Sequence, residues 1–170
     1  MRMAYIAIDT NIFEHLLNPE MNTASHIDKL LGQLSKMEYQ LLVDSTRKIG
    51  GEYLRLIVPI IRNMDETRPQ LPLLRFWMNP DIRHEVTLNP IDNLMQKIKN
   101  IIHEAHEYAD RAFVYIVCIE DSVLVTNDHI HILDRRRALL KGTKKFRGRN
   151  TDIQSSHTAY SAFLASGGLT

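Results

Sequence analysis

A chain of 170 residues, 44% of them hydrophobic and 24% charged, has the size and composition of one packed domain, 1–170. Intrinsic disorder and a disulfide-stapled miniprotein are excluded, because Cys118 is the only cysteine and the apolar content is ordinary. The net charge of +1 argues, as a sum, against a nucleic-acid partner, but it carries no information on how the charges are distributed. We expect a protein of the reducing cytoplasm with no membrane partner, since the apolar run that ends at Ile8 is too short for a bilayer span or a signal peptide.

Short apolar runs alternate with helical periods in the first half of the chain. The predicted elements are a strand at 5–8, a helix at 10–17 that Asn18-Pro19 breaks, a helix capped by Asn22-Thr23, a strand at 39–43 and a helix at 49–61 with a kink or an early end at Pro59. Gly50-Gly51 lies in the last helix, where each glycine costs roughly 1 kcal/mol relative to alanine. We therefore expect a late helix start or a close backbone approach there.

The second half begins with a stretch in which no period can be followed. Prolines interrupt residues 68–89, which we interpret as an irregular or partly helical insertion. The elements predicted after it are a helix from the cap Asn89, with Pro90 at its first position, to Ala105, a helix at about 109–119, a strand at 123–125, a strand at about 151–154 and a helix at about 156–165. Strands that alternate with helices indicate an α/β fold of three layers, α/β/α, with a mostly parallel central sheet.

Four carboxylates stand out against this pattern. Asp9 and Asp128 follow apolar strands, so a parallel sheet places both at the edge where such folds bind ligands. Glu52 and Asp110 lie on the apolar faces of their helices, where an ionised carboxyl needs a cation or a metal ion. Each one alone is explained equally well as a helix cap or a surface ion pair, but no lysine or arginine is obviously placed to neutralise all four. Hard oxygen ligands of this kind suit Mg²⁺ or Mn²⁺.

In order and spacing, these segments resemble the PIN-domain nucleases. The matching pieces extend from the start of the chain to about residue 130 and are Tyr5-Ile6-Ala7-Ile8-Asp9-Thr10-Asn11-Ile12-Phe13, Glu52-Tyr53, Asp110-Arg111-Ala112-Phe113-Val114 and Leu124-Val125-Thr126-Asn127-Asp128. The stretch 68–89 departs from the resemblance, because it is longer than a minimal PIN domain needs.

The resemblance implies a PIN-like fold and a metal-dependent endoribonuclease that cuts single-stranded RNA with a metal-activated water. Asp9, Glu52, Asp110 and Asp128 would be the catalytic ligands of Mg²⁺ or Mn²⁺. Thr10 and Asn127 would orient those carboxylates or a metal-bound water. A role as a toxin-type ribonuclease, with an antitoxin-like protein inhibitor as partner, and a role in RNA processing both remain open.

A basic segment at 135–149 changes the meaning of the net charge. Together with Asp134, this segment has a net charge of +7, which leaves −6 for the rest of the chain. Its cations are Arg135, Arg136, Arg137, Lys141, Lys144, Lys145, Arg147 and Arg149. Because phosphate contacts dominate nucleic-acid affinity, this segment is the expected RNA-binding surface. A solvated basic surface or a site for an acidic partner is the alternative interpretation.

Two other functions fit part of the pattern. A haloacid-dehalogenase-like magnesium phosphatase also begins with a strand that ends in aspartate, but it needs a second aspartate two residues later, where this chain has Asn11. A non-catalytic PIN-like module that binds RNA or a protein is the other alternative. The presence of all four carboxylates argues against it.

Histidines and aromatic residues are secondary candidates. His103 with His106, and His129 with His131 in a strand-like segment, have spacings that can ligate zinc, but we interpret them as surface residues, with a hydrogen bond from His106 to the acidic site as an alternative. Stacking of bases on Phe76 and Trp77 is considered, with packing as the commoner role. An apolar homodimer interface is a further hypothesis, built from Leu73, Leu74, Phe76, Trp77 and Met78.

Overall fold

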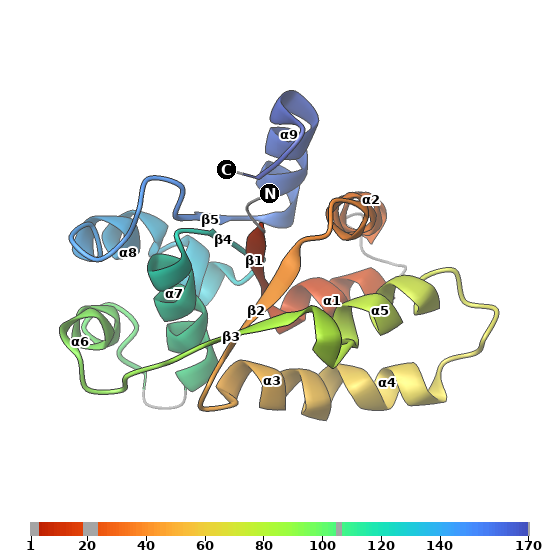
Figure 1. Cartoon of the computed structure of the whole chain (residues 1–170), viewed down its shortest axis with the longest axis horizontal. Coiled ribbons are helices and arrows are strands. Elements are labelled where there is room, and N and C mark those ends of the chain that lie inside the picture. Colours follow the sequence, from red (N-terminus) through yellow and green to blue (C-terminus); the bar gives the residue numbers. More distant parts are fainter. Residues whose placement is uncertain (1–3, 19–23, 105–106, 170) are drawn as a thin grey trace.

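The fold is built on one parallel sheet of five strands in the order β3-β2-β1-β4-β5 (Figure 1). The computed structural model describes residues 4–18, 24–104 and 107–169. The strands are β1 (Tyr5–Ile8), β2 (Gln40–Asp44), β3 (Arg83–Val86), β4 (Val123–Val125) and β5 (Asp152–Gln154). The predicted α/β class and the parallel sheet are confirmed.

Helices cover both faces of the sheet and complete three layers. Figure 1 shows α6, α7 and α8 on one side of the strands and α1, α2 and α5 on the other. Their bounds, with those of the remaining helices, are α1 (Thr10–Leu17), α2 (Ala24–Lys36), α3 (Lys48–Glu52), α4 (Val58–Asn63), α5 (Leu71–Met78), α6 (Asn93–Lys99), α7 (Tyr108–Glu120), α8 (Arg136–Gly142) and α9 (Ser156–Ser166). In the parts of the chain that are described, no helix joins the length and the apolar composition that crossing a bilayer requires.

The order in which strands are added to the sheet reverses at its centre. β1 lies between β2 and β4, with Ile6 paired to both Leu41 and Val123, and Ile6, Ala7 and Ile8 are completely buried. Since the chain leaves β1 for β2 on one side and later enters β4 on the other, the sheet has its switch point between β1 and β4. Parallel α/β sheets bind ligands in the crevice at the carboxyl ends of such strands.

The stretch 68–89 is more regular than its sequence predicts. It contains α5, a 3₁₀ turn at Pro80–Ile82 and the edge strand β3, which pairs with β2 from Leu41 to Asp44. The expectation of irregular structure is therefore wrong, whereas the alternative of a partly helical stretch is confirmed by α5, and the strand β3 is an addition to it. β3 escapes the pattern because only Val86 of its four residues is apolar, which an edge strand tolerates.

The apolar residues of α5 are used inside the molecule. Leu74 and Trp77 are completely buried and Met78 is 8% exposed, all within the hydrophobic core. Leu73 and Phe76 are half-buried against that core. Leu74, Trp77 and Met78 have little or no accessible surface, so they cannot form the hypothesised dimer interface, and packing, the commoner role considered for Trp77, is confirmed over base stacking.

The helix predicted at 49–61 begins at Lys48 and runs to Asn63, with a π-helical turn (Tyr53–Ile57) between α3 and α4. In this turn the amide of Val58 donates to the carbonyl of Tyr53, five residues earlier. Pro59 follows in the first turn of α4, so it does not end the helix. The late start expected from Gly50-Gly51 is not seen, and a Cβ at either glycine would meet no atom within 4 Å.

The helix predicted from Asn89 begins later and ends earlier. Asp92 caps α6 by accepting from the amide of Met95 at 2.7 Å, and it also accepts from the Tyr115 hydroxyl at 2.6 Å. The Asn89 side chain instead accepts from the amide of Ile91, which is 80% exposed. Asp92 is the better cap because its second oxygen is anchored to α7. The predicted break at Pro19, the cap Asn22-Thr23 and the helix end at Ala105 lie outside the described residues.

Candidate metal centre

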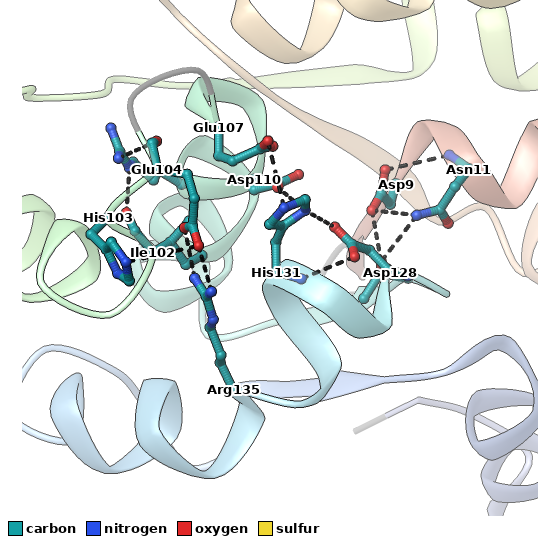
Figure 2. Close-up of polar contacts among 12 residues, drawn as sticks. Asp9, Asn11, Ile102, His103, Glu104, Glu107, Asp110, Asp128, His131 and Arg135 are labelled. Atoms are coloured by element: carbon teal, nitrogen blue, oxygen red, sulfur yellow. Dashed lines mark hydrogen bonds and ion pairs between the residues drawn. The ribbon is translucent and has the colours of Figure 1, made fainter.

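Asp9 joins the end of β1 to the start of α1. Its carboxylate caps α1, accepting from the amide of Asn11 at 3.4 Å and from the Asn11 side-chain amide at 2.8 Å. The hydroxyl of Thr126, which follows β4 on the other side of the crevice, donates to Asp9 Oδ2 at 2.6 Å. Asp9 is only 6% exposed, so the sheet edge holds this carboxylate in a fixed and nearly dry position (Figure 2).

Asp128 occupies the matching position after β4 and begins a second π-helical turn (His129–Leu133). Its Oδ1 accepts from the amide of His131 at 3.1 Å, and its amide donates to the Thr126 hydroxyl at 3.0 Å. Thr126 therefore bridges the two strand-end aspartates. The interpretation of 129–131 as strand-like is wrong, because the amide of Leu133 bonds back to the Asp128 carbonyl and closes a helical turn.

Asp110 enters the same crevice from the first turn of α7. Its side chain is 13% exposed, and its Oδ2 is buried without a hydrogen-bond donor among the described residues. His131 Nδ1 lies 3.6 Å from this oxygen and 3.0 Å from Asp128 Oδ2, while His131 Nε2 lies 3.7 Å from Glu107 Oε1. Figure 2 shows the imidazole pointing into the space between these carboxylates.

Glu52 comes to the site from α3 and is held by the first residue of α1. The Thr10 hydroxyl donates to Glu52 Oε2 at 2.8 Å, so Thr10 orients one of the four carboxylates. The next residue, Tyr53, is completely buried and donates its hydroxyl to the carbonyl of Ile8. The end of β1 and the π-helical turn thereby fix the position of Glu52 beside Asp9.

Burial and mutual repulsion perturb two of the carboxyls. Burial raises the pKa of Asp9 to about 7, against the hydrogen bonds from Thr126 and Asn11, and the charges of Glu52 and Asp128 add to the rise. Burial likewise raises the pKa of Asp110 to about 9, with contributions from Glu107, Asp9 and Asp128. The raised pKa values mean that burial, reinforced by the neighbouring carboxylates, disfavours the ionised forms of Asp9 and Asp110.

Lysine and arginine side chains act on this charge only from a distance, through the electrostatic attraction of Arg135 for Asp128 and Asp110. Within the ranges described, no lysine or arginine forms an ion pair with Asp9, Asp110 or Asp128. Arg135 lies nearby, but both its terminal nitrogens bind Glu104, at 2.7 and 2.5 Å, and the pair lowers the pKa of Glu104 to about 2. The buried Asp110 Oδ2, which has no hydrogen bond in the described residues and lies among other carboxylates, therefore faces the His131 ring, at 3.6 Å.

The structure places the side chain of Asn127 away from the carboxylates that we expected it to orient. Its carbonyl oxygen accepts from the amide and the hydroxyl of Ser156, both at 3.0 Å, and its amide nitrogen lies 3.0 Å from His15 Nδ1. Its backbone amide donates to the Asn11 side chain at 3.0 Å. Asn127 thus ties the end of β4 to α1 and α9, and its side chain does not contact the carboxylates. His106, the other expected contact, lies outside the described residues.

The basic segment divides into paired and free cations. Arg135 binds Glu104, Arg136 binds Asp152 at 2.5 Å, and the Arg147 guanidinium donates to the carbonyls of Leu140 and Gly148. The other five are exposed and have no ion-pair partner in the described ranges; they are Arg137, Lys141, Lys144, Lys145 and Arg149. These five are therefore the ones available to bind phosphate.

Three residues of the site are not predicted by the sequence pattern: Glu107, His131 and Thr126. Ligand atoms of Glu107, Asp110 and His131 all lie within 4.8 Å of one another, which is close enough to share one ion. The pattern assigns His131 to the surface, because histidines without a cysteine partner usually lie there. The signal that could identify it is its position three residues after Asp128, which places both on one side of a helical turn.

Comparison with known proteins provides no relative. No protein-family model, no curated protein and no solved structure matches the chain. The function is therefore inferred from the residues of the site itself.

Proposed function

We propose that this protein is a divalent-metal-dependent nuclease that hydrolyses phosphodiester bonds, most readily those of single-stranded RNA. The observation that carries the proposal is the convergence of Asp9, Asp110 and Asp128 from three separate elements, with the buried Asp110 Oδ2 lacking a hydrogen bond in the described residues and facing His131 at 3.6 Å. A site that raises the pKa of two carboxyls and forms no ion pair between them and a lysine or arginine, in the residues described, is stabilised by binding a cation. The lone thiol of Cys118 favours a reducing compartment, and the cytoplasm is our proposal.

The donor set fits a divalent ion. Glu107, Asp110 and His131 would hold it, because their ligand atoms lie within 4.8 Å of one another. Asp128 lies beside His131, and Asp9 and Glu52 are the neighbouring carboxylates that could complete the site. A bound ion of this class lowers the pKa of a water molecule and stabilises the charge that develops on phosphorus and the leaving oxygen. Thr126 links the Asp9 carboxylate to the backbone amide of Asp128, and Thr10 holds the Glu52 carboxylate, so these two threonines would help to position the groups that orient the attacking water.

His131 sharpens the choice between Mg²⁺ and Mn²⁺. Mg²⁺ prefers an all-oxygen set of ligands, whereas transition metals accept imidazole nitrogen together with carboxylate oxygen. Since both ring nitrogens of His131 face carboxylates of the site, at 3.0, 3.6 and 3.7 Å, we propose Mn²⁺ as the better fit. Free cations of the basic segment would bind the phosphates on either side of the scissile bond.

The phosphatase alternative is weakened by the position of Asn11. This side chain donates to Asp9 Oδ2 at 2.8 Å and to the Thr126 hydroxyl at 3.4 Å, and its oxygen accepts from the Asn127 amide. It therefore has a structural role and supplies no acid to a leaving group. Asp9 itself is almost completely buried, which leaves little access for attack on a phosphoryl group.

The decisive experiment compares Asp9→Asn and Asp128→Asn with Asp134→Asn, a control carboxylate whose side chain is 72% exposed. Asparagine caps a helix about as well as aspartate, so the first two variants should fold. We expect Mn²⁺-dependent cleavage of single-stranded RNA, with 5′-phosphate products, in the wild type and in Asp134→Asn. Cleavage that survives both Asp9→Asn and Asp128→Asn would contradict the proposal.

A further inference from the structure

We propose that Tyr108 and Lys48 form a subsite for one nucleotide of a single-stranded nucleic acid, with the base stacked on the tyrosine ring and the phosphate on the lysine. The inference rests on the proposed nuclease function and names the part of the site that grips the strand. Lys48 Nζ lies 5.1 Å from the centroid of the Tyr108 ring. Tyr108 is 57% exposed although it is a large aromatic residue, so much of the ring remains free for a ligand.

The pair belongs to the same two helices that carry the acidic site. Tyr108 begins α7 two residues before Asp110, and Lys48 begins α3 one helical turn before Glu52. Contacts between α3 and α7 bring both helix starts to the carboxyl edge of the sheet. A strand with one phosphate at the carboxylates therefore has its neighbouring nucleotide within reach of Tyr108 and Lys48.

The ring is held in position before any ligand arrives. Arg111 Cζ lies 5.9 Å from the Tyr108 centroid, and the Arg111 side chain is itself fixed by the carbonyls of Ile102, at 2.7 Å, and Glu104, at 2.6 Å. Arg111 is only 7% exposed, so it acts as a rigid support. A ring that is already ordered loses little conformational entropy on binding, which favours stacking on a base.

Charge at this point favours a polyanion. Lys48 and its neighbour Arg47 are both exposed, and in the described residues neither forms an ion pair, although carboxylates crowd the adjacent crevice. The Glu52 carboxylate, four residues after Lys48, accepts from Thr10 instead. Arg47, and Lys48 whose ammonium lies over the Tyr108 ring, can bind a phosphate, and the exposed part of the ring can stack on a base, so the group complements both parts of a nucleotide. A stacked base also explains why this tyrosine stays at the surface.

The test measures binding of labelled single-stranded RNA to the whole chain, in EDTA and again with Ca²⁺, with the integrity of the RNA checked afterwards. Tyr108→Ala should weaken binding by roughly 5- to 100-fold, and Tyr108→Phe should bind like the wild type, because phenylalanine keeps the stacking face. Lys48→Gln should weaken binding and reduce the salt dependence by the amount expected for about one phosphate, whereas Lys29→Gln, on α2, should change neither.

An RNA series with one abasic nucleotide at successive positions separates stacking from general damage. At the position that meets Tyr108, loss of the base should weaken binding to the wild type but not to Tyr108→Ala. Equal losses at every position in both proteins, or a Tyr108→Ala variant that binds within twofold of the wild type, would overturn the subsite and leave the Lys48–Tyr108 contact as structural only. A wild type that binds no single-stranded nucleic acid would overturn the nuclease proposal as well.

Discussion

The imidazole of His131 lies with its Nδ1 3.0 Å from Oδ2 of Asp128, three residues earlier on the same π-helical turn. The backbone amide of His131 also donates to the other oxygen of Asp128, at 3.1 Å. Both contacts depend on the wide turn that follows β4. The pair links the strand-end aspartates to the acidic start of α7, because the same imidazole faces Asp110 and Glu107.

Replacement of His131 should change the choice of metal. We expect His131→Gln to lower the affinity for Mn²⁺ by roughly tenfold to 100-fold and the affinity for Mg²⁺ by less. The variant lacks the imidazole nitrogen, which is a good ligand for Mn²⁺, whereas Mg²⁺ prefers oxygen ligands. Titration calorimetry with each metal measures the two affinities. His129→Gln is the matched control, because His129 belongs to the same turn and is 71% exposed. Equal losses for both metals would count against His131 as a ligand.

Without metal, the folded protein should lose stability as the pH rises. Asp9 and Asp110 have pKa values of about 7 and about 9 in the folded chain, against an ordinary value of 3.8, so between pH 4 and 9 the folded state binds more protons than the unfolded state. The free energy of unfolding therefore falls with pH, by up to about 1.4 kcal/mol per pH unit for one such group.

Urea unfolding in EDTA at pH 5, 7 and 9 measures this slope. Asp110→Asn should flatten the upper part of the curve, because the neutral amide has no proton to lose. Saturating Mn²⁺ should reverse the trend, since the cation favours the ionised carboxylates. If the stability of the metal-free wild type instead rose from pH 5 to pH 9, Asp9 and Asp110 would be ionised in the folded protein without a bound cation, which contradicts the prediction.

Gly148→Ala should be among the more damaging single changes outside the site. A Cβ at this position would lie 2.0 Å from Cγ of Asp121, whose carboxylate accepts from the amides of Asn150 and Thr151, both at 2.9 Å. We expect the free energy of unfolding to fall by about 2–4 kcal/mol, because either the clash or the broken hydrogen bonds must be accepted. Thermal and urea unfolding measure the change.

The control for that change is a pair of glycines with free space around them. Gly50→Ala and Gly51→Ala lie within α3, where an added Cβ meets nothing within 4 Å. Each should stabilise the protein by up to about 1 kcal/mol, since alanine is the better helix former. Destabilisation by either change would indicate a constraint on this helix other than packing.

The free cations of the basic segment should matter more for RNA affinity than the paired ones. Changing Lys141, Lys144 and Lys145 to glutamine together should lower affinity and reduce the slope of the salt dependence by about 0.7 for each phosphate that the variant no longer binds. Arg136→Gln should act mainly on stability, by about 1 kcal/mol or less, because Arg136 binds Asp152 at a partly exposed pair. Salt-dependent binding and unfolding curves distinguish these outcomes, and the reverse ranking would exclude this segment as the RNA-binding surface.

The strand-end carboxylates are predictable from the sequence because two local signals coincide there. The runs before Asp9 and Asp128 are apolar and completely or nearly completely buried, and each aspartate is a good helix cap. Once the sheet is parallel, both must lie at one edge. Asp110 and Glu52 follow from helical spacing, since each stands beside residues of the core.

Other features depend on tertiary contacts, which cannot be predicted from the spacing of residues along the chain. β3 forms because β2 offers it a pairing edge, and its own residues Arg83, His84 and Glu85 give no strand pattern. The start of α6 depends on the hydroxyl of Tyr115, more than twenty residues away, which favours Asp92 over the equally plausible cap Asn89. Glu107 reaches His131 across a gap in sequence that no local period describes.

Two members of the acidic site, Asp9 and Asp128, are also helix caps, and asparagine performs that second duty nearly as well. A single base change converts an aspartate codon into an asparagine codon. Two such changes, one at each position, would therefore give a chain that keeps both caps and its architecture but lacks two of the carboxylates of the proposed cation site. Evolution could therefore remove the proposed hydrolytic activity and keep binding without destabilising the fold. Homologues of this kind would be recognised by Asn at both of these positions.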